Sequence, residues 1–132
     1  MALMLIDVDR FKHINDTWGH PTGDCVLRTL AGVMRTAVRD QDTLGRLGGE
    51  EFAAILPETD GAGAAAIAER TLAAVRDAVL ATTDNGEPVK VTVSIGVTAL
   101  DAGNDTFESA LARADKALYR AKDNGRNRLE VG

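Results

Sequence analysis

Three acidic side chains lie where a metal-dependent reaction could be placed. Asp7 follows an apolar run over residues 2–6, and Glu50 and Glu51 follow two consecutive glycines. Carboxylates that converge on one hard cation suit magnesium, which binds few carboxylates together with water and substrate phosphates. The chain has only two histidines and one cysteine, so no cluster competes for zinc. The alternative for the two glutamates is a solvated acidic turn without a ligand.

Basic side chains that could neutralise phosphate charge lie close to the ends of predicted elements. Lys12 comes soon after Asp7, and Lys122 and Arg126 lie near the end of the last predicted helix. A favourable interaction with the negative end of that helix is the alternative role for these two. The chain has neither a P-loop motif nor a GxGxxG motif after a strand. Any phosphate chemistry here must therefore be of another kind.

Strands are predicted on either side of these groups from apolar runs, alternation and turn residues. Asp7 and Asp9 end the first strand, and both could project from one edge of a sheet. Gly48 to Glu51 form the predicted tip of a β-hairpin. The predicted strands cover residues 2–8, 43–47, 52–56, 89–98 and 127–131.

Apolar residues at helical spacing predict four helices between and after these strands. They cover residues 11–18, a stretch from a turn at 21–24 to about 38, residues 62–80, and a last stretch that stops near 124–125. Asp105 with Glu108 resembles a capping box at the start of this last helix. Val79 and Phe107 are assigned to the apolar faces of the third and fourth helices.

The order of these elements predicts an α/β fold, with helices against a central, mostly antiparallel sheet. The chain has 132 residues, the length of one domain, and 45% are apolar, which suffices for a core without staples. Twenty acidic and 15 basic residues give a net charge of −5, so no nucleic-acid partner is expected. The single Cys25 allows no internal disulfide, which fits a reducing compartment. No apolar run has the length of a membrane helix or the form of a secretory signal.

Motifs along the chain, in the right order, resemble the GGDEF family, the diguanylate cyclases. They are DVDRFKHIND at 7–16 with GH at 19–20 and GD at 23–24, GGEEF at 48–52, SIGV at 94–97, and ADxxLYxxKxxGRN at 114–127. Glutamate at the third position of GGEEF is a common active variant of the family signature. The resemblance runs from about residue 3 to 129 and implies a nucleotide-cyclase, polymerase-palm-like fold.

The sequence departs from the family pattern at its N-terminus. Domains of this family usually begin about 30 residues earlier, with a helix and a loop carrying an LTGLxNR-like sequence. This chain begins at the first core strand, so we expect residues 1–132 to be a single GGDEF domain that is short at its N-terminus. We also expect an upstream sensor domain to be missing from the chain.

The resemblance implies that two GTP molecules condense to cyclic di-GMP with release of two pyrophosphates. Two copies of the domain, each with one GTP, would meet as a homodimer, which brings the reactants together. Asp7 and Glu50 through carboxylates, and Val8 through its main-chain oxygen, would bind magnesium, with manganese as a further candidate. Glu51 would help to bind the metal or accept the proton of the attacking hydroxyl. The sequence does not distinguish which of these two roles belongs to Glu50 and which to Glu51. Lys12 would neutralise phosphate charge in the transition state.

The resemblance also implies a set of substrate-binding residues. They are Asn15, His20, Asp24, Gly48, Gly49, Lys122 and Arg126. Lys122 and Arg126 would hold the outer phosphates, and Asn15 and Asp24 would read the guanine edge. An aspartate that accepts from the N1–H and N2–H groups selects against adenine, which lacks these donors. For His20, packing between helix and loop is an equally good interpretation.

A second ligand site is implied by Arg39 and Asp42, an Arg-x-x-Asp pair shortly before the hairpin. Their place matches the product-inhibition site of the family, where cyclic di-GMP would bind. Arginine offers a planar fork for phosphates or guanine edges. Arg46 and Arg70 are further candidates for this site. As an isolated motif, the pair would be an ordinary surface contact at a helix end.

Two other functions remain open beside an active, product-inhibited cyclase. A catalytically weak or silent module that binds cyclic di-GMP or GTP would explain the motifs, although Asp7, Lys12, Glu50 and Glu51 are all present. A relative that makes another cyclic nucleotide would share the metal chemistry but not the guanine-reading residues. The predicted location is the bacterial cytoplasm, or the cytoplasmic part of a membrane sensor protein.

Overall fold

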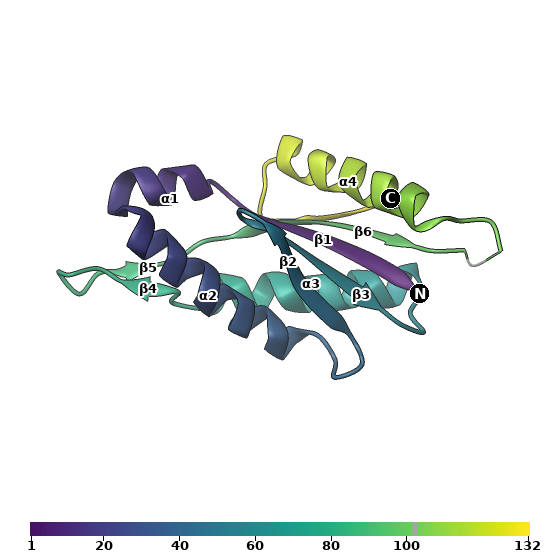
Figure 1. Ribbon diagram of the computed structural model, residues 1–132, viewed down its shortest axis with the longest axis horizontal. Coiled ribbons are helices and arrows are strands. Elements are labelled where there is room, and N and C mark those ends of the chain that lie inside the picture. Colours follow the sequence, from purple (N-terminus) through teal and green to yellow (C-terminus); the bar gives the residue numbers. More distant parts are fainter. Residues whose placement is uncertain (102) are drawn as a thin grey trace.

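The computed structural model describes residues 1–101 and 103–132. Within them, the helices α2, α3 and α4 lie against a five-stranded sheet of order β2-β3-β1-β6-β7, and α1 packs on α2 beyond the end of β1 (Figure 1). The strands of this sheet are β1 (Ala2–Val8), β2 (Thr43–Gly48), β3 (Glu51–Leu56), β6 (Val93–Ala99) and β7 (Leu129–Val131). The helices are α1 (Phe11–Trp18), α2 (His20–Ala37), α3 (Gly61–Asp77) and α4 (Phe107–Asp123). A two-stranded hairpin, β4 (Ala81–Thr82) and β5 (Pro88–Val89), stands apart from the sheet.

The predicted fold class is confirmed. β1 pairs antiparallel with β3 and with β6, and β2 pairs antiparallel with β3. β7 pairs with β6 in parallel, so the sheet of the described residues is mostly antiparallel. A parallel neighbour needs a long crossover, and α4 supplies it between β6 and β7.

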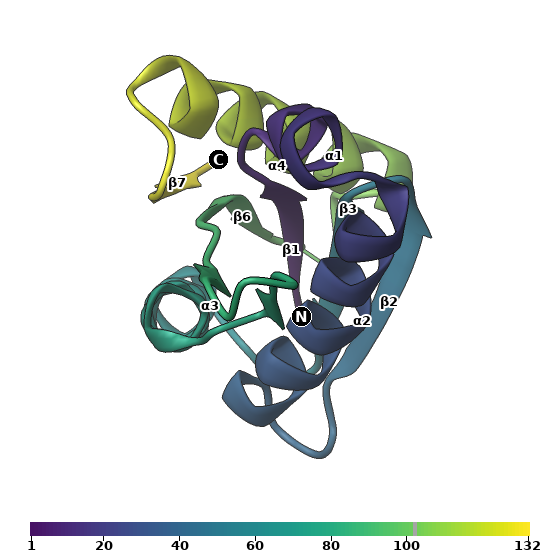
Figure 2. The ribbon, with the colours of Figure 1, turned by 90° about the vertical axis from the view of Figure 1, so that its left-hand side faces the viewer.

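The central strand β1 is buried along its whole length because helices cover both faces of the sheet. Met4 and Ile6 join the core beneath α2 and α3, whereas Leu3 and Leu5 pack with α4 on the other face. Figure 2 shows this layering, with α2 and α3 on one side of β1 and α4 on the other. A strand buried on both faces reads as a continuous apolar run, as residues 2–6 do.

Gly96 in β6 lets α4 pack close to the sheet. A Cβ atom at this position would lie 2.2 Å from the carbonyl oxygen of Ala114 and 2.4 Å from the amide nitrogen of Leu118. Both atoms belong to the backbone of α4, so no side chain could move aside. The distance of α4 from the sheet therefore depends on a residue without a side chain.

Three details of the predicted helices differ from the structure: the start of α2, the end of α3 and the burial of Phe107. α2 begins at His20, directly after Gly19 with φ of 89°, so the predicted turn at 21–24 is already helical. Pro21 fits there because the first turn of a helix needs no donor from it. Val79 is 49% exposed, since α3 ends at Asp77, and Phe107 is 52% exposed.

Two further predictions are corrected. The strand predicted over 89–98 is interrupted, because Val89 pairs with β4 while β6 begins at Val93. The capping box of α4 uses Thr106 and Ser109, one residue later than predicted, and Asp105 instead forms an ion pair with Arg113 at 2.7 Å. Among the described residues, no helix combines the length and apolar character needed to cross a membrane.

Candidate functional site

The acidic groups meet where β1 ends beside the tip of the β2–β3 hairpin. Asp7 lies opposite Glu51 in the β1–β3 register, and the amide of Val8 donates to the carbonyl oxygen of Glu50 at 3.2 Å. Asp7 is 4% exposed, Glu50 is half-buried and Glu51 is exposed. The fold thus brings the first strand and the hairpin, more than 40 residues apart in the sequence, to one place.

Lys122 forms an ion pair with the buried Asp7 from the last turn of α4. Burial raises the pKa of Asp7, the contact with Lys122 opposes this rise, and the nearby carboxylates of Glu50 and Glu51 add to it. A buried carboxylate next to other acids stays charged only with a cation beside it. The prediction had Lys122 on the outer phosphates, whereas its ammonium lies on Asp7 and has further donors to share.

The donor set at this corner suits a hard divalent cation. Asp7 and Glu50 offer carboxylate oxygens, the main chain of Val8 offers a carbonyl oxygen, and a cationic group already neutralises Asp7. In the described part of the chain, no three His, Cys, Asp or Glu side chains form a ready cage. Magnesium does not need one, because it keeps several waters and takes oxygens from substrate phosphates.

The turn of the hairpin depends on two glycines in left-handed or extended positive-φ conformations. Gly48 has φ of 151° and Gly49 of 52°, and the pairing of β2 with β3 shifts register between Arg46 and Gly48. Nε of Arg46 donates to the carbonyl oxygen of Gly49 at 2.8 Å. Arg46 therefore ties the turn that carries Glu50.

The corner between α1 and α2 holds an unusual buried acceptor. Oδ1 of Asn15 is buried and has no hydrogen-bond partner among the described residues. Gly23 makes room for it, since a Cβ there would lie 1.9 Å from this oxygen. An unpaired buried acceptor costs about 1–3 kcal/mol, so a ligand with an N–H donor would be favoured at this position.

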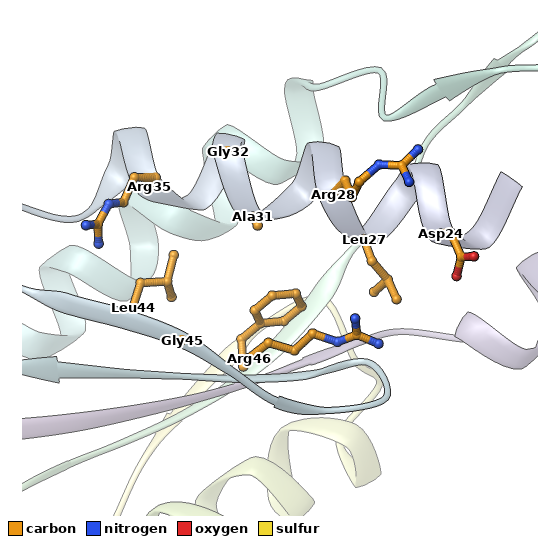
Figure 3. Close-up of a pocket in the computed structure, with 10 residues that line it drawn as sticks. Asp24, Leu27, Arg28, Ala31, Gly32, Arg35, Leu44, Gly45 and Arg46 are labelled. Carbon is orange, nitrogen blue, oxygen red and sulfur yellow. The ribbon is translucent and has the colours of Figure 1, made fainter. Parts of the chain in front are cut away.

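Asp24 lies at one end of a cavity of about 680 Å³ between α2 and β2 (Figure 3). Asp24 and Leu27 point from α2 toward β2, and Arg46 extends from β2 below Leu27. Because α2 begins at His20, Asp24 is not the N-cap of this helix. Its exposed carboxylate is therefore available to a ligand, while His20 is exposed at the first position of the helix.

The remaining phosphate candidates lie on the elements that adjoin the acidic corner. Lys12 is exposed in the first turn of α1, which follows β1 after two residues. Arg126 is half-buried in the turn after α4 and has φ of 64°. Lys122 thus lies in the last turn of α4 and Arg126 just after the end of this helix, as the sequence indicated.

Arg39 and Asp42 form a closed pair rather than an open fork. Nη2 of Arg39 lies 2.8 Å from Oδ1 of Asp42 and also donates to Thr59 Oγ1 at 2.6 Å. Burial would raise the pKa of Asp42, but the side-chain and backbone hydrogen bonds from Arg39 lower it overall. Arg39 and Arg70 line one hollow of about 640 Å³, whereas Arg46 lines the cavity beside Asp24. The structure thus separates Arg46 from its predicted group.

This hollow and the acidic corner lie at opposite ends of β1. Met1 lines the hollow and Asp7 lies at the other end of the strand. With a rise of about 3.3 Å per residue, the two are separated by about 20 Å along the strand. A ligand in the hollow would therefore touch neither Asp7 nor the hairpin tip that carries Glu50 and Glu51.

Sequence reasoning missed a set of contacts around Asp9. Its carboxylate is buried and accepts hydrogen bonds from Thr92 Oγ1 and Ser94 Oγ, both at 2.6 Å, and from the amide of Asn127 at 3.0 Å. Arg76 at the end of α3 also binds Asn127. These partners lie more than 80 residues from Asp9, so no local pattern could indicate them.

Comparison with known proteins shows the family of this chain. Residues 1–128 match the family described as "Diguanylate cyclase, GGDEF domain". Diguanylate cyclase A of Treponema denticola is 42% identical over 131 residues, which are 99% of this chain and 35% of that protein. Response regulator PleD of Caulobacter vibrioides is 46% identical over 127 residues, 96% of this chain and 28% of that protein. The chain thus spans about a third or less of the length of these relatives.

Solved structures have the same fold. The GGDEF domain of DgcB from Caulobacter crescentus, in complex with c-di-GMP, superposes with a TM-score of 0.91 at 37% identity over 98% of this chain and 76% of that one. The active GGEEF domain of a diguanylate cyclase from Vibrio cholerae gives 0.88 at 35% identity, over 98% of this chain and 81% of that one.

Proposed function

The chain belongs to the GGDEF family of diguanylate cyclase domains, and from this membership we propose that it condenses two GTP molecules into cyclic di-GMP. The observation that carries the proposal is the acidic corner, where buried Asp7 meets the hairpin that carries Glu50 and Glu51. The 3′-hydroxyl of one GTP attacks the α-phosphate of the other. The bond from that phosphorus to the bridging oxygen breaks, and pyrophosphate leaves. A second such step closes the ring.

Asp7, Glu50 and the main-chain oxygen of Val8 would hold a divalent cation, magnesium or manganese. When bound, the cation withdraws charge from the phosphates. Glu51, exposed next to Glu50, is placed to help bind this cation or to take the proton of the attacking hydroxyl. The buried position of Asp7 supports a role as a fixed ligand, because its carboxylate cannot turn freely into solvent.

Lys12, Lys122 and Arg126 would neutralise the phosphates around the same corner. Lys12 would act on charge that develops in the transition state, and Lys122 and Arg126 would bind the outer phosphates. The contact of Lys122 with Asp7 supports this, since an ammonium at the acidic corner can bridge the carboxylate and a phosphate oxygen. Gly48 and Gly49, without side chains, would let the hairpin backbone approach the phosphates.

Asn15 and Asp24 would select guanine. The unpaired Oδ1 of Asn15 and the exposed carboxylate of Asp24 lie on adjacent helices, and both accept hydrogen bonds. The N1–H and N2–H groups of guanine are donors, whereas adenine presents an acceptor at N1. His20 would border the nucleotide from the first position of α2.

Two copies of the chain would take part in this reaction, because the described residues offer one acidic corner for two nucleotides. We propose that residues 1–132 act as one domain, since strands from both ends of the chain, β1 and β7, belong to the same five-stranded sheet. Holding the two bound nucleotides in line converts a bimolecular reaction into an effectively intramolecular one. With GTP as substrate, the reaction belongs in the cytoplasm.

Cyclic di-GMP would inhibit by binding at Arg39 and Asp42, with Arg70 beside them. The hollow that Arg39 and Arg70 line supports this, as does its distance from the acidic corner. Because Arg39 is already bound to Asp42, a product phosphate or guanine would have to share or replace that contact. Binding there would be noncompetitive with GTP.

Incubation of the chain with GTP and magnesium, with products resolved by mass, tests the proposal. We expect cyclic di-GMP and pyrophosphate from the wild type and none after chelation of the metal. Glu50→Gln should abolish turnover while the circular dichroism and melting temperature stay unchanged, because the half-buried tip residue supports no core contact.

Two outcomes would contradict the proposal. Near-normal synthesis by folded Glu50→Gln would remove Glu50 from the metal site. GTP that binds but stays unconverted, also in a dimeric form of the domain, would favour the silent binding module.

A further inference from the structure

The turn after α4 has a backbone that needs outside support. α4 ends at Asp123, and the three residues that follow its C-cap have φ of 119° at Gly125, 64° at Arg126 and 52° at Asn127. Glycine adopts this region freely, whereas two consecutive residues with side chains do so only where surrounding contacts impose it. Arg126, proposed above to bind the outer phosphates, therefore lies on a turn that contacts elsewhere must hold.

One support comes from inside the fold. The carboxylate of Asp9, 7% exposed at the end of β1, accepts from the amide of Asn127 at 3.0 Å. Its two oxygens also accept from Thr92 and Ser94, each at 2.6 Å. Three donors from the start of β6 and from the turn thus converge on one carboxylate. Such charge-assisted hydrogen bonds are stronger than neutral ones, and they fix Asn127 against the sheet.

The other support comes from outside. Arg76, in the last turn of α3, donates from Nε to Oδ1 of Asn127 at 2.7 Å and from Nη2 to its carbonyl oxygen at 3.0 Å. Arg76 thus grips both the side chain and the main chain of Asn127. On the other side of the turn, the amide of Arg126 donates to the carbonyl oxygen of Ala121 at 2.9 Å. The backbone of Arg126 is therefore fixed from both sides.

We propose that Asp9 and Arg76 are positioning residues that clamp Asn127 and so hold Arg126 where it can bind the outer phosphates of GTP. In this proposal both residues act through Asn127, and neither is assigned a contact with the nucleotide. The inference rests on the proposed function for the phosphate contact of Arg126. The clamp itself rests on the hydrogen bonds described above.

Arg76→Ala tests the clamp, because Arg76 is exposed and its loss leaves the core intact. We expect affinity for GTP to fall about tenfold, the scale of a lost charge-assisted hydrogen bond. Affinity for GMP, which lacks the outer phosphates, should not change. Arg120→Ala is the matched control, an exposed arginine that donates to the carbonyl oxygen of Val131 at 2.8 Å, and it should bind GTP as the wild type does.

A double-mutant cycle separates positioning from direct binding. If Arg76 acts through Arg126, then Arg76→Ala should add nothing to the loss caused by Arg126→Ala. Full additivity of the two losses, an equal loss for GTP and GMP, or unchanged GTP affinity in Arg76→Ala would each overturn the proposal.

Hydrogen exchange without nucleotide tests the clamp apart from the proposed function. The Asn127 amide, bound to Asp9, should exchange faster in Arg76→Ala than in the wild type and in Arg120→Ala. Unchanged exchange would refute the clamp. Faster exchange in a chain whose wild type binds no GTP would uphold the clamp on the turn and refute the proposed function instead.

Discussion

Replacing Gly96 with alanine should push α4 off the sheet. The added Cβ would lie 2.2 Å from the carbonyl oxygen of Ala114, and real contacts of this kind do not fall below 3.0 Å. The difference, 3.0 − 2.2, means that α4 or β6 must move by at least 0.8 Å. Since the Cβ is held rigidly on the backbone of β6 and the atoms it meets are backbone atoms of α4, relief must come from movement of whole elements.

The cost should be about 2 kcal/mol of unfolding free energy. Overpacking a core costs about 1–3 kcal/mol, and a rigid backbone clash falls in the upper part of that range. Alanine regains roughly 0.5–1 kcal/mol, because glycine loses more freedom on folding. For a chain of this size, about 2 kcal/mol lowers the melting temperature by roughly 6–10 °C. The shift should also draw Lys122 away from Asp7, so GTP affinity should fall as well.

Urea and thermal unfolding of Gly96→Ala and Gly32→Ala form the assay. Gly32 lies in α2 with nothing within 4 Å of an added Cβ, so alanine there should stabilise by about 1 kcal/mol through helix propensity. The two variants carry the same chemical change and should shift stability in opposite directions. Gly96→Ala within about 0.5 kcal/mol of the wild type would refute the close approach of α4.

The other predictions concern ligands and acid. Asp24→Ala should weaken GTP binding by roughly 1.5–3 kcal/mol and leave ATP binding unchanged, as measured by isothermal titration with both nucleotides. An unchanged preference for GTP over ATP would show that Asp24 does not bind guanine. Arg39→Ala should weaken binding of cyclic di-GMP and make more product from excess GTP, whereas a progress curve that stalls as in the wild type would contradict the inhibitory role. Because hydrogen bonds from Arg39 hold the pKa of Asp42 below 3.8 in the folded chain, this carboxylate stabilises the fold above that pH and its contribution is lost as pH falls further. Asp42→Asn should therefore flatten the loss of stability in acid, and parallel curves for both chains would count against the ion pair.

Elements whose cause is local could be predicted from the sequence. The first strand, over residues 2–8, was predicted with its observed bounds because a short apolar run that ends before a polar turn has few alternatives. The hairpin followed from Gly48 and Gly49, which allow a tight turn. The capping box was placed one residue early because Asp105 and Thr106 are both good caps, and only the contact of Asp105 with Arg113 decides between them.

Features that depend on distant partners could not be predicted. The apolar alternation over 89–98 is the same whether Val89 pairs with β4 or with the main sheet. The contact of Lys122 with Asp7 joins residues 115 positions apart, so charge patterning along one helix gives no sign of it. The sequence nevertheless indicated both residues, because a resemblance to a family identifies site residues without stating which of them contact each other.

The burial of β1 between two partners has a consequence for synthesis on the ribosome. β1 emerges well before its neighbours β3 and β6, which begin only at residues 51 and 93. Until both have emerged, β1 remains an apolar segment with unpaired edges and exposed faces in the nascent chain. The ion pair of Asp7 with Lys122 can form only later still, after α4 has been synthesised. Such strands bind chaperones or other unfinished chains. Slow translation between β3 and β6 should therefore lower the yield of folded chain more than the same delay after β7.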